Sequence, residues 1–224
     1  MSVADLEVDH VYVWVSKGGP ELAALQELGL KVHERVAVHT GQGTSSQSFL
    51  FRTMYLELLW PEDERELAAF IAAMPNAGGP PPLGDTTGIS PFGIGLHYRT
   101  PDSPPLPLPL DPYTASWMPE GSLIEVPDHT SPQSPSVFLL HGPLAYLDVP
   151  AHLTDQPLGL ERLTGLAVTV PNGAALDPAM EYLVEHGVAS LRRGDRPHME
   201  LTFDQARQGK TLEIGPSFPL VIRY

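Results

Sequence analysis

The stretch Val8-Asp9-His10-Val11-Tyr12-Val13-Trp14-Val15 alternates small apolar residues with ring-bearing ones, and Met54-Tyr55-Leu56-Glu57-Leu58-Leu59-Trp60 has a similar alternation. Successive side chains of a strand point to opposite faces, so both stretches are predicted β-strands with one apolar face. His10 then lies opposite the valines of its strand, together with Tyr12, and Glu57 lies opposite the neighbouring leucines of its own. An imidazole and a carboxylate held on rigid strands are half of a plausible metal site.

The composition limits the classes of protein to which the chain can belong. It has 224 residues, of which 42% are apolar, with 27 acidic against 13 basic side chains and a formal net charge of −14. This length suits two small domains or one domain of two similar modules. An acidic surface repels phosphate groups and anionic lipids, so we expect neither a nucleic acid nor a membrane as a partner. No apolar run approaches the roughly 20 residues of a membrane helix, and residues 1–10 lack the pattern of a secretory signal.

Cysteine does not occur in the chain. Disulfides, thiolate nucleophiles and Cys-ligated zinc are therefore excluded, and any metal would be bound by His, Asp, Glu or backbone oxygen. A reducing, cytoplasmic compartment is the simplest expectation for such a chain.

Residues 8–60 have the pattern of a strand, a helix and three further strands. Pro20 precedes a segment with leucines at helical spacing, and Gly29 follows it, so a helix is predicted over 21–28. The remaining predictions here are strands at 31–39, 47–53 and 54–60, followed by a helix at 62–74 with an acidic first turn.

Residues 163–224 repeat this order of predicted elements. Asp177 is predicted to cap a helix that begins at Pro178. Strands are predicted at 163–170, 189–193, 198–204 and 210–214, with 218–224 as a closing edge.

The chain between these two regions is rich in proline. The prolines of 80–82 and 101–112 predict irregular, polyproline-like connectors, and short strands are predicted at 92–99, 122–126 and 137–141. The predicted organisation is a first βαβββ module plus helix at 1–75, a connector with short strands or a divergent module at 76–160, and a second βαβββ module at 161–224. The predicted fold class is α+β, with paired βαβββ modules whose mixed, curled sheets form a cleft.

Three segments of the first unit occur in an informative order. They are Asp9-His10-Val11 in the first strand, His39-Thr40-Gly41-Gln42-Gly43-Thr44 in the turn, and Tyr55-Leu56-Glu57-Leu58-Leu59-Trp60 in the fourth strand. In this combination the chain resembles the vicinal oxygen chelate superfamily, in particular its glyoxalase-like members. The first unit matches over roughly its whole length, and the last unit matches more weakly.

The resemblance implies a divalent metal, such as Zn, Ni, Mn or Fe, held in the cleft by His and Glu from the first and fourth strands. Carried onto this sequence, the ligands are His10, Glu57 and Glu213. The fourth position falls on Gly165, or on Ile94 if the second unit begins at residue 92, and neither side chain binds a metal. Three ligands would leave a position open for water or substrate, as in catalytic sites. The alternative is a cleft that has no metal.

The resemblance also suggests roles for other residues of the cleft. Glu57 and His39 are candidate catalytic groups. The candidates for contact with a substrate are Tyr12, Trp14, Gln42, Arg52, His97 and Arg99. Simpler interpretations stay open, because His10 could bond a backbone carbonyl and Glu57 could pair with Arg52 or Arg99. His198 could fill the fourth ligand position.

Two functions from different classes follow. The first is a metal-dependent lyase, isomerase or dioxygenase that acts on vicinal oxygens of a small molecule, with the cation stabilising an enolate-like anion. The second is a metal-free protein that sequesters a small apolar ligand in the same cleft. A homodimer is possible in either case. A scaffold protein that uses the proline segment 101–112 for a partner is a third interpretation.

Overall fold

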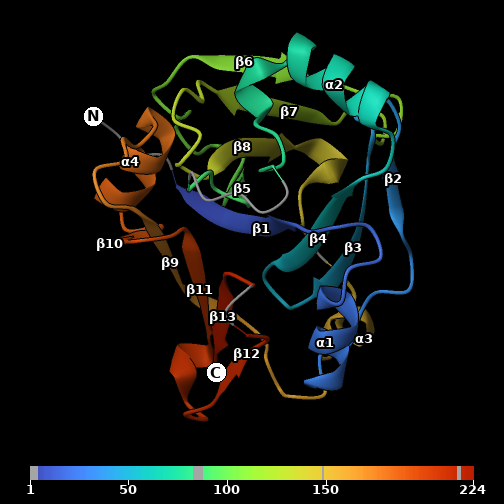
Figure 1. Ribbon diagram of the computed structural model, residues 1–224, viewed down its shortest axis with the longest axis vertical. Coiled ribbons are helices and arrows are strands. Elements are labelled where there is room, and N and C mark those ends of the chain that lie inside the picture. The colour runs from blue at the N-terminus through green and yellow to red at the C-terminus, as the bar shows by residue number, and fades with distance from the viewer. Residues whose placement is uncertain (1–4, 83–87, 148, 216–217) are drawn as a thin grey trace.

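The computed structural model describes residues 5–82, 88–147, 149–215 and 218–224. Over these residues, four α-helices accompany two mixed β-sheets, one of eight strands and one of five. The larger sheet curls into an open half-barrel, and the smaller sheet lies beside it (Figure 1). The predicted α+β class, with curled sheets that form a cleft, is therefore confirmed. No helix of the described residues is long and apolar enough to cross a membrane.

One half of the large sheet is the first predicted unit. β1 (Leu6–Trp14) lies parallel to β4 (Tyr55–Pro61), and β3 (Thr44–Leu50) and β2 (Ala37–His39) follow towards the edge. α1 (Glu21–Glu27) connects β1 to β2, which gives the predicted βαβββ order. The strand predicted over 31–39 is shorter than expected, because only its last three residues pair with β3.

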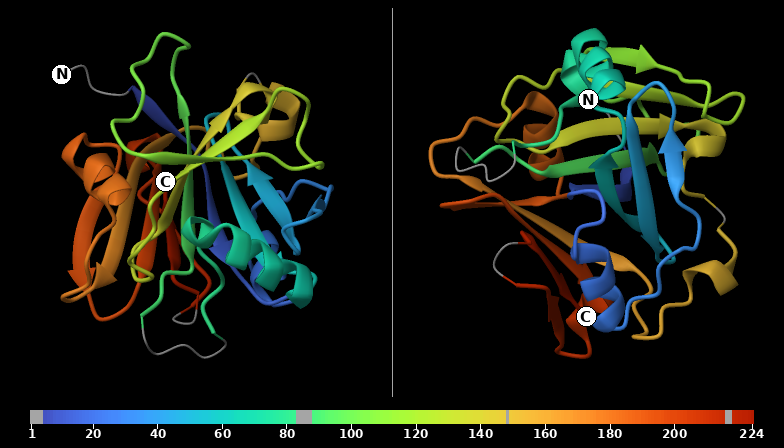
Figure 2. Two further views of the ribbon diagram at one scale, coloured as in Figure 1. Left: turned by 90° about the horizontal axis from the view of Figure 1, so that it is seen from above. Right: turned by 45° about the vertical axis from the view of Figure 1, so that its right-hand side comes forward.

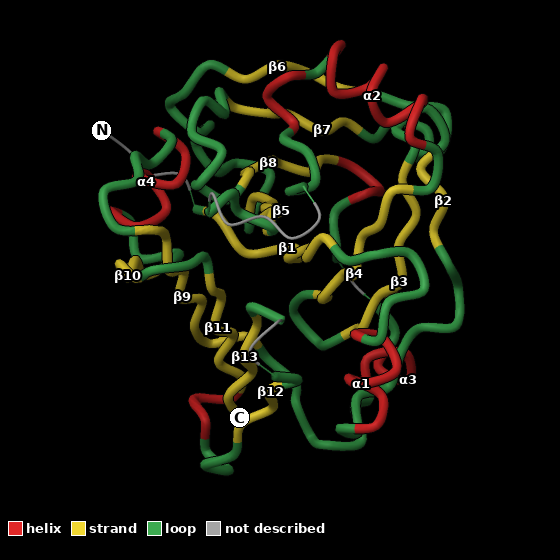
Figure 3. The backbone as a smooth tube through the Cα atoms, in the orientation of Figure 1, coloured by secondary structure: helices red, strands yellow, loops and turns green. Residues whose placement is uncertain are grey.

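The other half of the large sheet comes from the middle of the chain. β5 (Phe92–Tyr98) runs antiparallel to β1 and parallel to β8 (Ser136–His141), and β7 (Leu123–Pro127) and β6 (Leu110–Tyr113) complete the order β2-β3-β4-β1-β5-β8-β7-β6. A loop, not a helix, follows β5 (Figure 3). The structure therefore pairs the first unit with residues 92–141 and not with 163–224, because β5 occupies the edge of β1 that a second unit needs.

The proline-rich region contains one strand that the sequence interpretation excluded. Pro112 lies within β6, which was predicted to be irregular. β6 is the outer strand of the sheet, where the missing N–H of a proline leaves no partner unpaired. Residues 83–87 of the same region lie outside the described residues. α2 (Glu64–Ala73) follows β4 and lies over β6 and β7 in Figure 1.

The five-stranded sheet is built differently from either half of the large one. Its strands are β9 (Leu163–Pro171), β10 (Ser190–Gly194), β11 (His198–Phe203), β12 (Thr211–Glu213) and β13 (Leu220–Arg223), in the order β10-β9-β11-β13-β12. α4 (Pro178–Glu185) connects β9 to β10, which then pair directly in parallel. α3 (Ala151–Thr154) belongs to the connection from the large sheet. The predicted elements of 163–224 are present, but their strand order is not that of the first unit.

The two sheets share one apolar core. Val11 and Val13 of β1 and Val168 and Phe203 of the small sheet are fully buried in the same cluster. The rings of Phe51 and Phe203 are 4.4 Å apart, centroid to centroid. Figure 2 shows the small sheet packed against the side of the large one. This core occupies one face of β1 and leaves the opposite, concave face available for a pocket.

Candidate functional site

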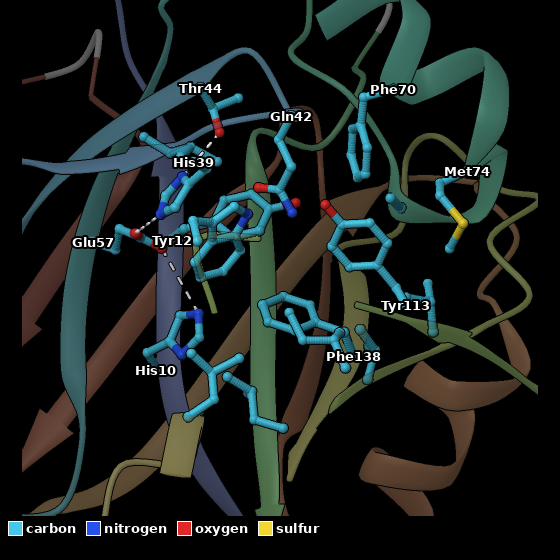
Figure 4. A pocket seen from close by; sticks show the side chains of 18 of the residues that line it. His10, Tyr12, His39, Gln42, Thr44, Glu57, Phe70, Met74, Tyr113 and Phe138 are labelled. Atoms are coloured by element: carbon cyan, nitrogen blue, oxygen red, sulfur yellow. Dashed lines mark hydrogen bonds and ion pairs between the residues drawn. The ribbon is translucent and has the colours of Figure 1, made fainter. Parts of the chain in front are cut away.

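A pocket opens on the concave face of the large sheet (Figure 4). Its polar side is formed by His10 and Tyr12 of β1, His39 of β2, Glu57 of β4, and Gln42, which follows β2. Its remaining walls are mostly apolar and aromatic, and include Phe70, Met74, Tyr113, Trp117, Ile124 and Phe138. The cavity between the lining side chains has a volume of about 140 Å³. A cavity of roughly 150 Å³ holds a molecule the size of benzene, so this one suits a small organic molecule.

The strand faces are those that the alternation predicts. His10 and Tyr12 face the pocket, whereas Val11 and Val13 are fully buried on the opposite face. β1 and β4 are parallel neighbours, with Tyr12 beside Glu57 in the register. Two segments that are far apart in the sequence therefore bring an imidazole and a carboxylate into one pocket.

Two glycines of β5 make room for the rings of β1. A Cβ at Gly93 would lie 2.1 Å from the ring of Tyr12, and one at Gly95 would lie 2.6 Å from Cε1 of His10. Real atoms do not approach so closely, so a side chain at either position would displace the ring above it. Gly95 pairs with His10 across the centre of the sheet. The second half of the sheet thus supplies space, and not a metal donor, opposite His10.

A buried carboxylate fixes the orientation of His10. Its Nδ1 lies 2.8 Å from Oδ1 of Asp9, and its ring stacks on Tyr55 with centroids 4.3 Å apart. Burial alone would raise the pKa of Asp9, but the hydrogen bonds from His10 and His97 lower it to about 2. The Asp9 carboxylate is therefore ionised and can only accept, so Nδ1 of His10 carries the hydrogen. Nε2 then faces Glu57, with 3.7 Å between Nε2 and Oε2.

Glu57 lies between two histidines. Its Oε2 faces His10, and its Oε1 lies 3.9 Å from Nε2 of His39 (Figure 4). Glu57 is 8% exposed, and within the described chain no residue donates a hydrogen bond to its carboxylate. A buried carboxylate opposite a nitrogen lone pair is unfavourable unless a proton or a cation lies between them. The Glu57 carboxylate therefore marks a place where positive charge is needed.

His39 completes this polar side of the pocket. Its Nδ1 lies 2.9 Å from Oγ1 of Thr44, and its ring lies against Trp117 with centroids 4.8 Å apart. Burial lowers the pKa of His39, and the charge of Glu57 offsets this only in part. The ring is therefore neutral at pH 7, so it can accept a proton or bind a cation.

Two tyrosines, the buried Tyr12 and the half-buried Tyr55, line the pocket beside Glu57. Burial, reinforced by the charge of Glu57, raises the pKa of Tyr12 to about 12, and the same causes raise the pKa of Tyr55 well above its usual value. The hydroxyl groups of Tyr12 and Ser136 are hydrogen-bonded at 2.5 Å. Both phenols are therefore neutral at pH 7 and add no negative charge to the pocket.

The two arginines predicted to contact a substrate lie outside the pocket. Arg52 pairs with Glu161 at 3.1 Å, and Arg99 pairs with Asp5 at 3.0 Å. All four side chains are about half exposed. Neither arginine is among the residues that line the pocket, because each is paired with an acidic side chain at the surface. Neither of them is the partner of Glu57.

His97 was also predicted to contact a substrate, and it lies behind the pocket instead. Its Nδ1 is 3.0 Å from Oδ2 of Asp9, and its Nε2 is 3.5 Å from Oε2 of Glu7. Burial alone would lower the pKa of His97, but these two carboxylates raise it. His97 therefore holds Asp9 in place and does not line the pocket.

Three further residues predicted to belong to the site lie outside the pocket. Trp14 lines a separate, neighbouring cavity. Glu213 lies on β12, the outer strand of the small sheet, and His198 lies on β11. Neither residue lines the pocket, so Glu213 is not a ligand of a metal held by His10 and Glu57, and His198 does not fill a fourth position. The prediction failed because it assumed that 163–224 pairs with the first unit.

The sequence interpretation missed most of the apolar walls. Phe70 and Met74 belong to the apolar stripe of α2, which periodicity alone cannot distinguish from a stripe packed into a core. Tyr113 and Trp117 come from the proline-rich region, where no periodic pattern marks them. Phe138 was recognisable only as part of a strand. Knowledge of the strand order would have been needed to find these residues.

The residue types at and around Glu57 suit a divalent cation, but the distances between their donor atoms are longer than a bound cation requires. Two imidazoles and a carboxylate are a common donor set, and the Nδ1 atoms of His10 and His39 are held by Asp9 and Thr44, as those of metal-binding histidines usually are. Ligands of a tetrahedral zinc lie about 3.3 Å apart, which follows from bonds of about 2.0 Å. The separations of 3.7 and 3.9 Å are a few tenths of an ångström longer. Accordingly, no group of three or more such side chains in the described residues is already arranged to hold a metal ion.

Comparisons with known proteins bear on the fold alone. No protein-family model matches the chain, and no curated protein matches its sequence. The crystal structure of a hypothetical protein from Staphylococcus aureus aligns with a TM-score of 0.58 and 10% identity, over 97% of this chain and 98% of that chain. Hypothetical protein BH1468 from Bacillus halodurans C-125 aligns over 61% of this chain and 94% of that chain, with 15% identity and a TM-score of 0.40. The first of these two has a similar fold over nearly its whole length.

Proposed function

We propose that the chain is a glyoxalase-like enzyme of the vicinal oxygen chelate type, which binds a small organic molecule in the pocket over β1 and β4. The observation that carries this proposal is the Glu57 carboxylate, each of whose oxygens faces a ring nitrogen of a separately fixed histidine. A large sheet made of two halves that meet at their first strands supports the same proposal. The mostly apolar walls favour a substrate with an apolar body.

In this proposal, His10, His39 and Glu57 hold a divalent cation. When bound, such a cation polarises adjacent oxygens of a substrate and stabilises the anion formed from it. Asp9 keeps the hydrogen of His10 on Nδ1, so the Nε2 lone pair beside Glu57 would be available to a cation. A Glu57 oxygen that is not bound to the cation would be able to accept a proton from a substrate carbon held beside it. The aromatic walls hold the body of the substrate and keep water away from that proton.

The metal content of protein purified without chelators tests this proposal. We expect about one divalent transition-metal ion per chain in the wild type and a loss of at least tenfold in occupancy for His10→Ala, since removal of one of three ligands opens the site. His141→Ala is the matched control, because His141 is also paired with a carboxylate, Glu125 at 2.8 Å, but lies outside the pocket. Metal that stays bound in His10→Ala, or a wild type that takes up none of Mn, Fe, Ni and Zn, contradicts the assignment.

A metal-free binding protein is the second candidate, and the two glycines of β5 favour it. Gly93 and Gly95 place no donor opposite His10, and the room they leave is filled by rings. In this case a small aromatic ligand would bind as tightly to Glu57→Gln as to the wild type, because shape and apolar contact would dominate its affinity. Calorimetric titration of the two proteins distinguishes the candidates.

A further inference from the structure

A second cavity lies next to the pocket, on the other side of Tyr12. Trp14, Ile71, Phe92 and His129 are among its lining residues, and Tyr12 is the one described residue that lines both spaces. The neighbouring residues Ser136 and Val137 of β8 line the second cavity and the first pocket respectively. The hydrogen bond between Tyr12 and Ser136 therefore lies at the boundary between them.

Apart from Tyr12, His129 is the ionisable residue among the described residues that line this cavity, and a residue next to the other sheet fixes its orientation. Its Nδ1 lies 2.7 Å from Oδ2 of Asp177, which stands at the start of α4. Oδ1 of Asp177 accepts from the backbone N–H groups of Thr130 and Ser131, both at 2.9 Å. Burial alone would raise the pKa of Asp177, but these bonds lower it. The carboxylate is thus an acceptor only, and Nδ1 of His129 must be the donor.

The other ring nitrogen of His129, Nε2, lies beside Gly78, which also lines the cavity. Within the described chain no residue forms a hydrogen bond with Nε2, although the side chain is only 13% exposed. The ring edge faces Gly78, where a Cβ would stand 3.5 Å from both Cδ2 and Nε2. In the tautomer whose Nδ1–H donates to Asp177, the imidazole presents a lone pair at Nε2. A half-buried acceptor to which no described residue donates can anchor a polar group of a ligand.

We propose that this cavity is a second binding site, which takes a small planar aromatic molecule carrying a hydroxyl or N–H donor, with the donor bonded to Nε2 of His129. Trp14 and Phe92 supply aromatic walls for such a ring. Sites that hold a buried unpaired acceptor reject an isosteric ligand that lacks the donor, because the acceptor then loses its water without a replacement. The proposal does not depend on any metal or reaction in the first pocket.

Phenol carries a hydroxyl donor, whereas its methyl ether anisole has a methyl group in place of that hydrogen and cannot donate. The titration uses tryptophan fluorescence in a Trp117→Phe background, because Trp117 lines the first pocket and Trp14 the second. We expect phenol to quench the signal and to bind about ten times more tightly than anisole, which corresponds to one hydrogen bond. In His129→Leu this ratio should fall to about one, while His141→Leu should keep it, since His141 has a carboxylate partner but lines neither space.

A cavity-filling variant keeps the test decisive if His129→Leu does not fold. Ile71 on α2 lines the second cavity and not the first, so Ile71→Phe should fill it and abolish quenching by phenol without touching the pair of His129 and Asp177. Equal affinities of phenol and anisole for the wild-type site overturn the proposal. So does a ratio that persists in His129→Leu, or quenching that survives in Ile71→Phe. None of these results bears on the metal content of the first pocket, so the two proposals fail independently.

Discussion

Asp9 is a buried carboxylate that orders the groups behind the first pocket. It is fully buried and accepts from Nδ1 of both His10 and His97, at 2.8 and 3.0 Å. Its pKa is about 2 in the folded chain against an ordinary value of 3.8. A carboxyl group with a depressed folded pKa adds stability above its unfolded pKa, and this stability is lost as the pH falls through the folded value. The contribution of Asp9 should therefore disappear between about pH 4 and pH 2.

Asp9→Asn tests this contribution. The amide has one oxygen for three N–H donors, those of His10, His97 and the Tyr146 backbone. We therefore expect the free energy of unfolding at pH 7 to fall by about 3 kcal/mol, as when one partner of a buried ionic group is removed. The variant should also lose less stability than the wild type between pH 4 and pH 2. Urea denaturation at a series of pH values measures both effects. Asp5→Asn is the control, because Asp5 is half exposed and its pair with Arg99 should contribute at most about 1 kcal/mol. A variant profile as steep as that of the wild type would contradict the prediction.

At the scale of single elements, two aspartates occupy the N-cap positions of helices and have different roles. Oδ1 of Asp63 accepts from the N–H groups of Arg65 and Glu66, at 2.9 and 3.0 Å, and so caps α2. Asp177 occupies the corresponding position of α4, as predicted, but its carboxylate makes no cap hydrogen bond. It binds residues 129–131 of the large sheet's loops instead. The sequence therefore predicts the helix start correctly and the partner of its aspartate wrongly.

Alanine substitutions should separate these two roles. Asp63→Ala removes a cap and should lower the free energy of unfolding by about 1 kcal/mol. Asp177→Ala leaves the four donors of residues 129–131 without their charged acceptor, so a loss of about 3 kcal/mol is expected. Chemical denaturation of both variants gives the comparison. Asp63→Asn should retain most of the stability, because asparagine caps helices as well as aspartate does. Equal losses for the two alanine variants would mean that Asp177 acts as an ordinary cap.

The contrast between local sequence patterns and long-range partners explains how much of the site could be predicted from the sequence. Alternation along a strand is local, so the sequence places His10 beside Tyr12 and turns Glu57 away from the leucines, as observed. Strand order depends on which strand edges pair with each other, and no local sequence pattern indicates this pairing. Glu213 was therefore assigned to the wrong sheet, and the walls at Tyr113 and Trp117 were missed. β6 was missed for a related reason, since a proline is tolerated only because that strand lies at an edge.

At the scale of the whole molecule, the two sheets are joined by more than the chain. Their fully buried rings Phe51 and Phe203 touch, with centroids 4.4 Å apart, within one continuous core. Backbone bonds add to this junction, because the N–H of Arg52 donates to the carbonyl of Glu161 at 2.8 Å. The pair of Asp177 and His129 links the sheets at a second place. We infer from these contacts that the two sheets unfold together.

Phe203→Ala tests this cooperativity, because all three tryptophans of the chain, Trp14, Trp60 and Trp117, lie outside the small sheet. Loss of a buried ring should lower the free energy of unfolding by about 4 kcal/mol. If the sheets unfold together, tryptophan fluorescence and far-ultraviolet circular dichroism should shift by the same amount in urea, since both follow one transition. Phe70→Ala is the control, because Phe70 is half-buried at the pocket and its loss should have a smaller effect. A fluorescence transition that stays in place while the dichroism splits into two steps would show that the large sheet, with its pocket, is stable without the small one.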